Sequence, residues 1–155
     1  MLIGVDWGGT KIEIVAMEAD GTELLREREL TPRGDYEGCL RMVQELVERI
    51  EVTMGRSGPV GIGIPGSIDP ISGRGKGGSS TWINGMPIVE DLHRVLRRPL
   101  RIQNDADCFA ASEARDGAGK EYRVVFGVIL ASGAGAGIAI DQVAHHGPNN
   151  SAGDW

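Results

Sequence analysis

The segment from residue 3 to residue 15, Ile-Gly-Val-Asp-Trp-Gly-Gly-Thr-Lys-Ile-Glu-Ile-Val, constrains the fold more than any other part of the sequence. Two apolar runs flank a glycine pair at 8–9, which predicts two strands joined by a tight turn. Glycines let the backbone approach a ligand and leave its N–H groups free to bind a phosphate. Thr10 adds a hydroxyl group and Lys11 a cation, and Asp6 suits an anion site if Mg²⁺ lies between them, often through water. By itself, this pattern fits a phosphate site and a plain hairpin with a solvated aspartate equally well.

The acidic balance of the sequence limits the classes of partner. Its 155 residues fit one domain of ordinary size and carry 16 basic and 22 acidic side chains, a formal net charge of −6. Proteins that bind nucleic acids or membrane surfaces normally lean the other way, so neither partner is expected. No apolar run approaches the roughly 20 residues needed to span a bilayer.

Cysteine usage and the N-terminus bear on location. Cys39 and Cys108 fall in predicted helices, where buried free thiols in a reducing cytosol are the expected state, although a disulfide between them stays open. Strand-like residues begin directly after Met1, which leaves no room for a signal peptide or an N-terminal DNA-binding module. We therefore expect a cytoplasmic protein.

The first part of the chain predicts an antiparallel meander followed by a helix. Strands are expected at about 2–7, 11–18 and 22–31, with turn residues before the third. Apolar residues then recur at helical spacing between Asp35, a suitable N-cap, and Gly55, a suitable helix end.

The next part alternates short strands with helices. Residues 60–64 predict a buried parallel strand, and Pro87 opens a helix at its first position after a long Gly- and Ser-rich loop. Asn104 and Asp105 stand where a strand at about 100–103 leads into a helix. Right-handed crossovers place these strands parallel to the first, and ligands gather at the carboxyl ends of such strands. We expect Asp6, Pro65-Gly66 and Asn104-Asp105 to converge on one rim.

The last part predicts a second hairpin at about 123–142, with a glycine turn at 131–135. Its apolar face and unpaired edge predict either pairing with another chain, and thus a homodimer, or cover by the first part of the chain. His145 and His146 would point to opposite faces of a strand, so surface positions are expected for them in preference to metal ligation.

Six motifs follow one another along the chain: DWGGTK at 6–11, GIGIPGSIDP at 61–70, STWINGMP at 80–87, QNDADCFAASEA at 103–114, VILASGAGAGIAI at 128–140 and SAGDW at 151–155. In these motifs and in their order the sequence resembles the ROK sugar kinases (repressor, open reading frame, kinase), a branch of the actin–hexokinase superfamily. Segments 31–36, TPRGDY, and 80–82, STW, are most similar to the fructokinase (manno-fructokinase) branch.

The resemblance implies an α/β fold of the actin-like ATPase (ribonuclease H-like) type, a mixed sheet with three antiparallel strands, then parallel strands and flanking helices. It also implies two domains: an N-terminal sugar-kinase domain at 1–120, and the truncated start of the second domain at 121–155. The implied activity is ATP-dependent phosphorylation of a hexose hydroxyl group, with a small-molecule hexose and a nucleotide as partners.

The resemblance further assigns roles to individual residues. Asp105 matches the catalytic base, which accepts the proton of the attacking hydroxyl group; a helix N-cap is the alternative that the residues alone favour. Asp6 matches the carboxylate that holds Mg²⁺ through water. The implied substrate-binding residues are Gly66, Asn84, Gly85, Asn104, Asp105 and Asp154, and the implied ATP-binding residues are Asp6, Gly8, Gly9, Thr10, Lys11, Ser132 and Gly133.

Several departures from the family pattern weaken these implications. Ala131-Ser132-Gly133 replaces the usual Gly-Thr-Gly, and Asp154 replaces a glutamate. Gly77 and Ser79 stand where fructokinase relatives carry asparagines, so the sugar is in doubt. The family's zinc-binding cysteine cluster, most of its nucleotide-binding domain and its closing helix have no counterpart here, so no zinc is expected.

Half a cleft excludes water poorly, so we expect a weakly active or inactive kinase fragment. The alternatives are a non-catalytic fragment that binds sugar or a partner, and a ROK transcriptional repressor without its DNA-binding module.

Overall fold

A mixed five-stranded sheet forms the centre of the computed structural model, which describes residues 1–130 and 133–153. Strands β1 (Leu2–Trp7), β2 (Lys11–Met17) and β3 (Glu23–Leu30) form the predicted antiparallel meander. Strands β4 (Val60–Ile64) and β7 (Leu100–Asn104) join β1 in parallel, which gives the order β3-β2-β1-β4-β7. The predicted mixed topology is therefore confirmed.

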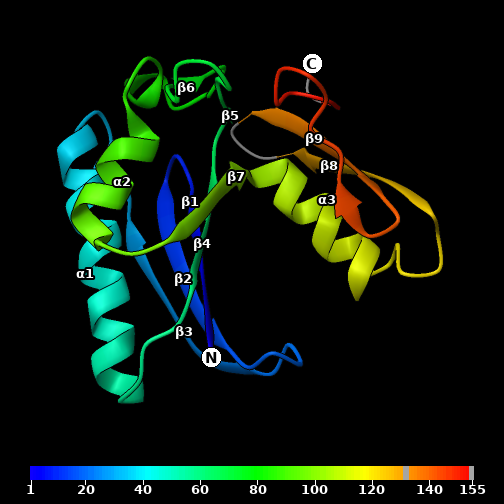
Figure 1. Ribbon diagram of the computed structural model, residues 1–155. Coiled ribbons are helices and arrows are strands. Elements are labelled where there is room, and N and C mark those ends of the chain that lie inside the picture. The colour runs from blue at the N-terminus through cyan, green and yellow to red at the C-terminus, as the bar shows by residue number, and fades with distance from the viewer. Residues whose placement is uncertain (131–132, 154–155) are drawn as a thin grey trace.

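Helices α1 (Tyr36–Met54) and α2 (Ile88–Leu96) cover one face of this sheet (Figure 1). Apolar side chains alternate along the strands and recur every third or fourth residue along α1, so both elements bury an apolar face. The largest side chains in the shared core are fully buried: Trp7, Ile12, Ile14, Leu40, Leu46, Ile50, Ile64, Ile83, Ile88 and Leu92.

The ends of the two helices follow from local backbone chemistry. Asp35 caps α1 by accepting a hydrogen bond from the Gly38 N–H at 2.8 Å, and Gly55 ends it with a left-handed φ of 65°. The start predicted for α2 is one residue early. Pro87 is its N-cap with a non-helical ψ of 60°, and the helix begins at Ile88.

The loop between β4 and α2 contains two short strands that pair with each other and one 3₁₀ turn. β5 (Ser67–Ile68) and β6 (Gly75–Lys76) form a two-stranded hairpin, and a 3₁₀ turn, η1, spans Thr81–Ile83. This loop lies at the end of the molecule where β1, β4 and β7 finish (Figure 1).

A second, smaller layer faces the open side of the sheet. Helix α3 (Asp105–Arg115) packs on β8 (Val124–Leu130) and β9 (Ala134–Ile140), and β10 (Val143–Ala144) pairs with β9 (Figure 1). A Cβ atom on Gly137 would lie 2.3 Å from the Ala106 carbonyl oxygen, so only glycine permits this approach. The boundary expected near residue 120 stays a prediction, although this small core groups α3 with the later strands.

The outer face of β8 is apolar and exposed. Phe126 is 54% and Leu130 is 80% exposed, whereas Gly127 between them is buried against α3. The hairpin is thus covered on one face by α3, and pairing with another chain stays a prediction. Within residues 1–130 and 133–153, none of the helices has the length and apolar character of a membrane span.

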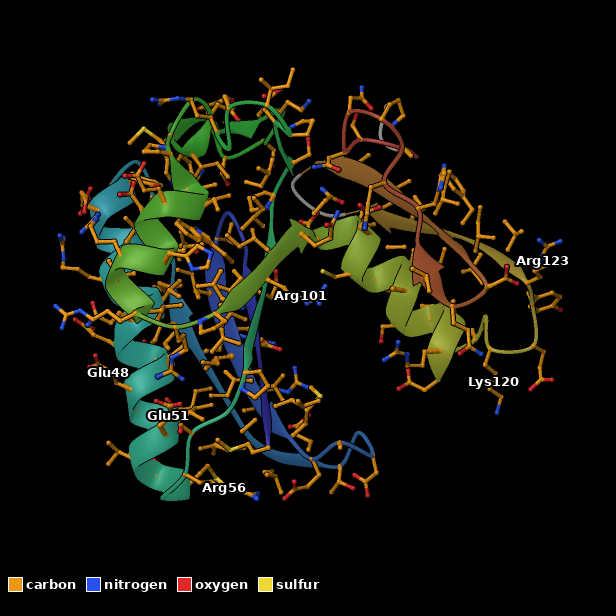
Figure 2. The ribbon with its side chains drawn as sticks, viewed as in Figure 1. Glu48, Glu51, Arg56, Arg101, Lys120 and Arg123 are labelled. Atoms are coloured by element: carbon orange, nitrogen blue, oxygen red, sulfur yellow. The ribbon has the colours of Figure 1, made fainter. Side chains whose placement is uncertain are left out.

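An ion pair links the two covering helices near their ends. Arg98, just after α2, donates to the Glu51 carboxylate of α1 at 2.5 and 2.8 Å and to the Gly58 carbonyl oxygen at 3.3 Å; Glu51 is labelled on α1 in Figure 2. The Arg98 guanidinium lowers the pKa of Glu51 below its usual 4.5. The pair therefore stabilises the folded state where Glu51 is ionised, and this contribution is lost as the pH falls through the lowered pKa.

Replacing Arg98 should expose this contribution. We expect Arg98→Gln to lower the free energy of unfolding by about 1–3 kcal/mol at pH 7, and the deficit to shrink below pH 4.5 as Glu51 becomes protonated. Urea unfolding at several pH values measures both. Arg123→Gln, which removes an exposed pair with Asp141, is the control and should cost less than about 1 kcal/mol. A deficit that is constant down to pH 3 would contradict the assignment to Glu51.

Candidate functional site

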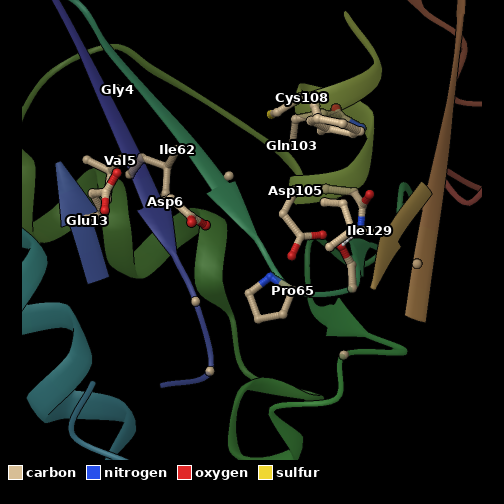
Figure 3. Close-up of a pocket in the computed structure, with 18 of the residues that line it drawn as sticks. Gly4, Val5, Asp6, Glu13, Ile62, Pro65, Gln103, Asp105, Cys108 and Ile129 are labelled. Atoms are coloured by element: carbon tan, nitrogen blue, oxygen red, sulfur yellow. Dashed lines mark hydrogen bonds between the residues drawn. The ribbon is translucent and has the colours of Figure 1, made fainter. Parts of the chain in front are cut away.

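A cleft of about 1120 Å³ separates the open face of the five-stranded sheet from α3 and the second glycine turn. Figure 3 shows the carboxylates of Asp6 and Asp105 pointing into it from opposite sides, with Pro65 between them in the view. The other predicted residues in its lining are Gly8, Gly9, Thr10, Lys11, Gly66, Asn104 and Gly133.

Strand register explains why the predicted groups converge. Asp6 of β1 is the register partner of Gly63 in β4, and β4 in turn pairs in parallel with β7, whose last residue leads into α3. A Cβ atom on Gly63 would lie 3.7 Å from the Asp105 Cα atom. The expected shared rim at the carboxyl ends of β1, β4 and β7 is confirmed.

Asp6 occupies an acidic part of the cleft. Burial raises the pKa of Asp6, and neighbouring Glu13, its register partner on β2, raises it further, while Arg28 lowers it. Arg28 and Arg26 are both hydrogen-bonded to Glu13. In the described part of the chain no hydrogen-bond donor contacts the Asp6 carboxylate, which leaves its oxygens available to a cation or to water.

This arrangement fits Mg²⁺ held mainly by phosphate. Across residues 1–130 and 133–153 no three His, Cys, Asp or Glu side chains cluster as a complete metal cage. Mg²⁺ in phosphoryl-transfer sites keeps several waters and needs only one or two carboxylates besides the phosphates. Asp6, beside the glycine turn, would supply one such carboxylate.

Asn104 and Asp105 divide the tasks at the start of α3. Asn104 is the N-cap: its Oδ1 accepts from the Asp107 N–H at 3.0 Å, and its Nδ2 donates to the Gly66 carbonyl oxygen at 2.7 Å. Asp105 is the first helical residue, and its Oδ1 accepts from the Ala106 N–H at 2.8 Å. The N-cap alternative considered for Asp105 therefore applies to Asn104, which retains one N–H and one oxygen lone pair for a ligand.

The backbone conformation and the close packing of the loop at position 66 require glycine. Its φ is +79°, and a Cβ atom there would lie 2.4 Å from the Gly78 nitrogen. Both observations exclude a side chain, because the left-handed conformation and the close backbone contact each penalise one. Gly66 thus brings residues 77–79 to the edge of the cleft.

Asn84 and Gly85 are not brought into the cleft lining with the others. The Asn84 side chain accepts from the Gly78 N–H at 3.0 Å and donates to the Gly78 carbonyl oxygen at 3.1 Å. This amide therefore shapes the loop that carries Ser79, and its role as a direct sugar ligand stays a prediction, as does that of Gly85.

The remaining predicted positions lie at the second glycine turn and the end of the chain. Gly133 lines the cleft, and a Cβ atom on it would lie 3.7 Å from the Ser79 Cβ atom. Ser132 and Asp154 lie outside the described residues.

Sequence reasoning missed several cleft residues on the open face of the sheet. Glu13 of β2 lines the cleft, as do Arg101 and Gln103 of β7. Arg101 is labelled in Figure 2. The period-two alternation of the strands places them on the face of Asp6 and could have identified them. His146, expected at the surface after a strand, is only partly exposed, and its Nδ1 lies 3.2 Å from the buried Asp107 carboxylate.

Cys39 and Cys108 are both free thiols; the prediction that both are buried is confirmed for Cys39 and is wrong for Cys108, which is exposed. Cys39 is buried in the core, whereas the Cys108 sulfur reaches the cleft beside Asp105. Shielding from bulk water raises the pKa of Cys108 to about 11, with Asp107, Asp105 and Asp6 contributing in the same direction. Cys108 is therefore a neutral thiol near pH 7 despite its access to the cleft.

Alkylation measures this pKa. We expect Cys108 to react with iodoacetamide at pH 8 about a hundredfold more slowly than a small thiol of pKa 9.0, because the thiolate fraction falls tenfold per pH unit. Its rate should keep rising to about pH 11, with Cys39 counted separately by peptide mass spectrometry. A Cys108 rate equal to that of the small thiol at pH 8 would contradict the raised pKa.

The chain is similar to known proteins along nearly its whole length. The sequence profile of the ROK family matches residues 2–155. An N-acetyl-D-glucosamine kinase of Haemophilus influenzae (strain 86-028NP) is 38% identical over 154 residues, which cover 99% of this chain and 51% of that protein. The chain spans about half the length of the curated relatives it matches.

Solved structures share the fold. A ROK family glucokinase from Streptomyces griseus, solved in complex with glucose and AMPPNP, has a TM-score of 0.89 at 28% identity, covering 99% of this chain and 49% of that one. A ROK family transcriptional regulator, a homolog of the E. coli MLC protein, has a TM-score of 0.81 at 18% identity, covering 99% and 40%. The second likeness shows the fold alone. Together with the sheet order, these structures confirm the expected actin-like α/β fold.

Proposed function

The chain belongs to the ROK family, and we propose that it supplies the sugar- and phosphate-facing cleft of an ATP-dependent hexose kinase. One observation carries the proposal: the glycine turn at 8–9, the Asp6 carboxylate and the Asp105 carboxylate line the same cleft. These are the parts that phosphoryl transfer needs, namely a phosphate cradle, a site for a divalent cation and a group that positions the attacking hydroxyl.

Asp105 is the proposed catalytic residue. Its position at the first turn of α3 fixes the carboxylate at the cleft edge, where it accepts the proton of the sugar hydroxyl as the oxygen attacks the γ-phosphorus and ADP leaves. The transition state of phosphoryl transfer is loose, so the geometry of the hydroxyl matters more than the strength of the base. A carboxylate held by a helix N-terminus suits that task.

The turn between β1 and β2 is the proposed phosphate cradle. Gly8 and Gly9 expose backbone to the cleft, and Thr10 and Lys11 are exposed beside them. Lys11 adds positive charge, and Asp6 would hold Mg²⁺ through water at the same turn. Mg²⁺, when bound, neutralises phosphate charge during transfer.

The sugar is the finer part of the proposal. Segments 31–36 and 80–82 favour fructose by resemblance, whereas the relatives reported above are an N-acetyl-D-glucosamine kinase and a glucokinase. The rim at 77–79 carries no large side chain, and a Cβ atom on Gly77 would meet nothing within 4 Å. This space suits a substituent such as an acetamido group, so N-acetyl-D-glucosamine and glucose are tested first, with mannose and fructose beside them.

A second candidate is sugar binding without transfer. It is supported by Asn104, which lines the cleft and keeps one N–H and one oxygen lone pair beyond its bonds to Gly66 and Asp107, because these groups can bind a sugar hydroxyl without any transfer. A kinase and a protein that only binds sugar differ in turnover and not in fold.

Substitution of Asp105 tests the assignment. We expect Asp105→Asn to lower kcat/KM for the preferred hexose by about 10²–10⁴-fold, because the hydroxyl loses its proton acceptor, and to leave sugar binding by calorimetry nearly unchanged. Asp116→Asn, at the exposed far end of α3, is the matched control and should keep full activity. Sugar binding without turnover in the unchanged protein would select the second candidate. Failure to bind any of the four sugars would contradict both.

A further inference from the structure

Thr31 is hydrogen-bonded to both ends of the glycine turn, at Gly8 and at Thr10. Its hydroxyl group donates to the Gly8 carbonyl oxygen at 2.7 Å, and its backbone N–H donates to the Thr10 carbonyl oxygen at 3.0 Å. Thr31 is 6% exposed and does not line the cleft. A ligand at the turn would therefore never touch this side chain, although the backbone that it meets is fixed by it.

The residues after Thr31 anchor the segment to α1. The Pro32 carbonyl oxygen accepts from the Asp35 N–H at 3.1 Å and from the Cys39 thiol at 3.4 Å. Asp35 in turn caps the helix through Gly38. The segment 31–36 is thus held by α1, whose inner face is buried in the core, and Thr31 has little freedom to follow the turn if the turn moves.

Tyr36 extends the same contact to the strand that leads into the turn. Its ring stacks on Trp7, with ring centroids 6.2 Å apart and planes at 22°, and Trp7 directly precedes Gly8. The Tyr36 hydroxyl donates to the Asp91 carboxylate of α2 at 3.0 Å. Both rings are buried, so β1 enters the turn at a fixed position.

The glycine turn is also contacted by the loop that carries residues 77–80, part of which lines the cleft. A Cβ atom on Gly9 would lie 2.8 Å from the Ser80 hydroxyl oxygen, and Ser80 is buried next to Ser79, which lines the cleft. The turn is therefore contacted by two separate segments, through Thr31 and through Ser80.

We propose that segment 31–36 is a positioning clamp, in which the Thr31 hydroxyl sets the conformation of the 8–10 turn for phosphate binding. This proposal deepens the function proposed above and rests on it only for the identity of the phosphate ligand. Preorganised backbone donors bind an anion more tightly than mobile ones, because less ordering accompanies binding. Thr31 is thus a positioning residue for the nucleotide and has no direct part in sugar binding.

The test compares Thr31→Val, which keeps the shape and removes the hydroxyl group, with Thr31→Ser, which keeps the hydroxyl group. We expect Thr31→Val to weaken Mg·ATP binding by about two- to tenfold, the range for loss of one hydrogen bond, and Thr31→Ser to restore it. Sugar binding should be unchanged in both. Thr53→Val is the matched control. It loses an equivalent hydrogen bond to the Arg49 carbonyl oxygen on the exposed side of α1 and should bind Mg·ATP normally.

A ligand-free measurement separates the clamp from the function of the cleft. The residue 31 amide donates to Thr10, and its NMR hydrogen-exchange protection, taken relative to the intrinsic rate of each residue type, should be about two- to tenfold lower in Thr31→Val than in Thr31→Ser. If the unchanged protein does not bind Mg·ATP, the proposed function fails and this protection still decides the clamp. Equal protection in the two variants, or equal loss of sugar and Mg·ATP binding, would overturn it. Thr31→Ala carries the same expectation and replaces the valine variant if that variant does not fold.

Discussion

The parallel register of β1, β4 and β7 is the constraint on which the rest of the structure depends. It aligns the carboxyl ends of three strands that are far apart in the sequence, so that Asp6 and the start of α3 meet at one rim. Gly63 of β4 connects the two positions: it is the register partner of Asp6, and a Cβ atom on it would lie 3.7 Å from the Asp105 Cα atom, an ordinary van der Waals contact.

The two faces of the central sheet have different chemistry, and this difference creates the cleft. The face under α1 and α2 is apolar and closed, whereas the other face carries glycines and charged side chains such as Glu13 and Arg101. α3 buries its small residues against β8 and β9 instead of against this open face. The walls of the remaining space come from segments that lie far apart in the sequence. A concave space between such segments is a common location for a ligand site.

Several polar residues in the family motifs act on the backbone. The side chains of Asn84 and Asn104 are bonded to main-chain groups of Gly78, Gly66 and Asp107. The buried Asn104 amide needs such partners, because an unpaired polar group is costly away from water, whereas the exposed Asn84 fixes the loop at Gly78. The same principle explains Thr31, whose hydroxyl group serves the turn and not the cleft. A motif residue therefore indicates that a site is near, and the hydrogen bonds decide whether it contacts the ligand.

The sequence by itself determined the elements and the rim. Period-two and helical spacing, the Asp35 cap, Gly55 and the crossover rule were enough to predict the meander, the helices and the meeting of Asp6 with Asp105, because these depend on local chemistry and chirality. Only the tertiary structure decided which side-chain amides are hydrogen-bonded to the backbone and that Asn104, not Asp105, caps α3. It also decided that the Thr31 hydroxyl group bonds to the glycine turn and that α3 packs on the later hairpin. These outcomes depend on distances between segments far apart in the chain, and no spacing within one segment encodes them.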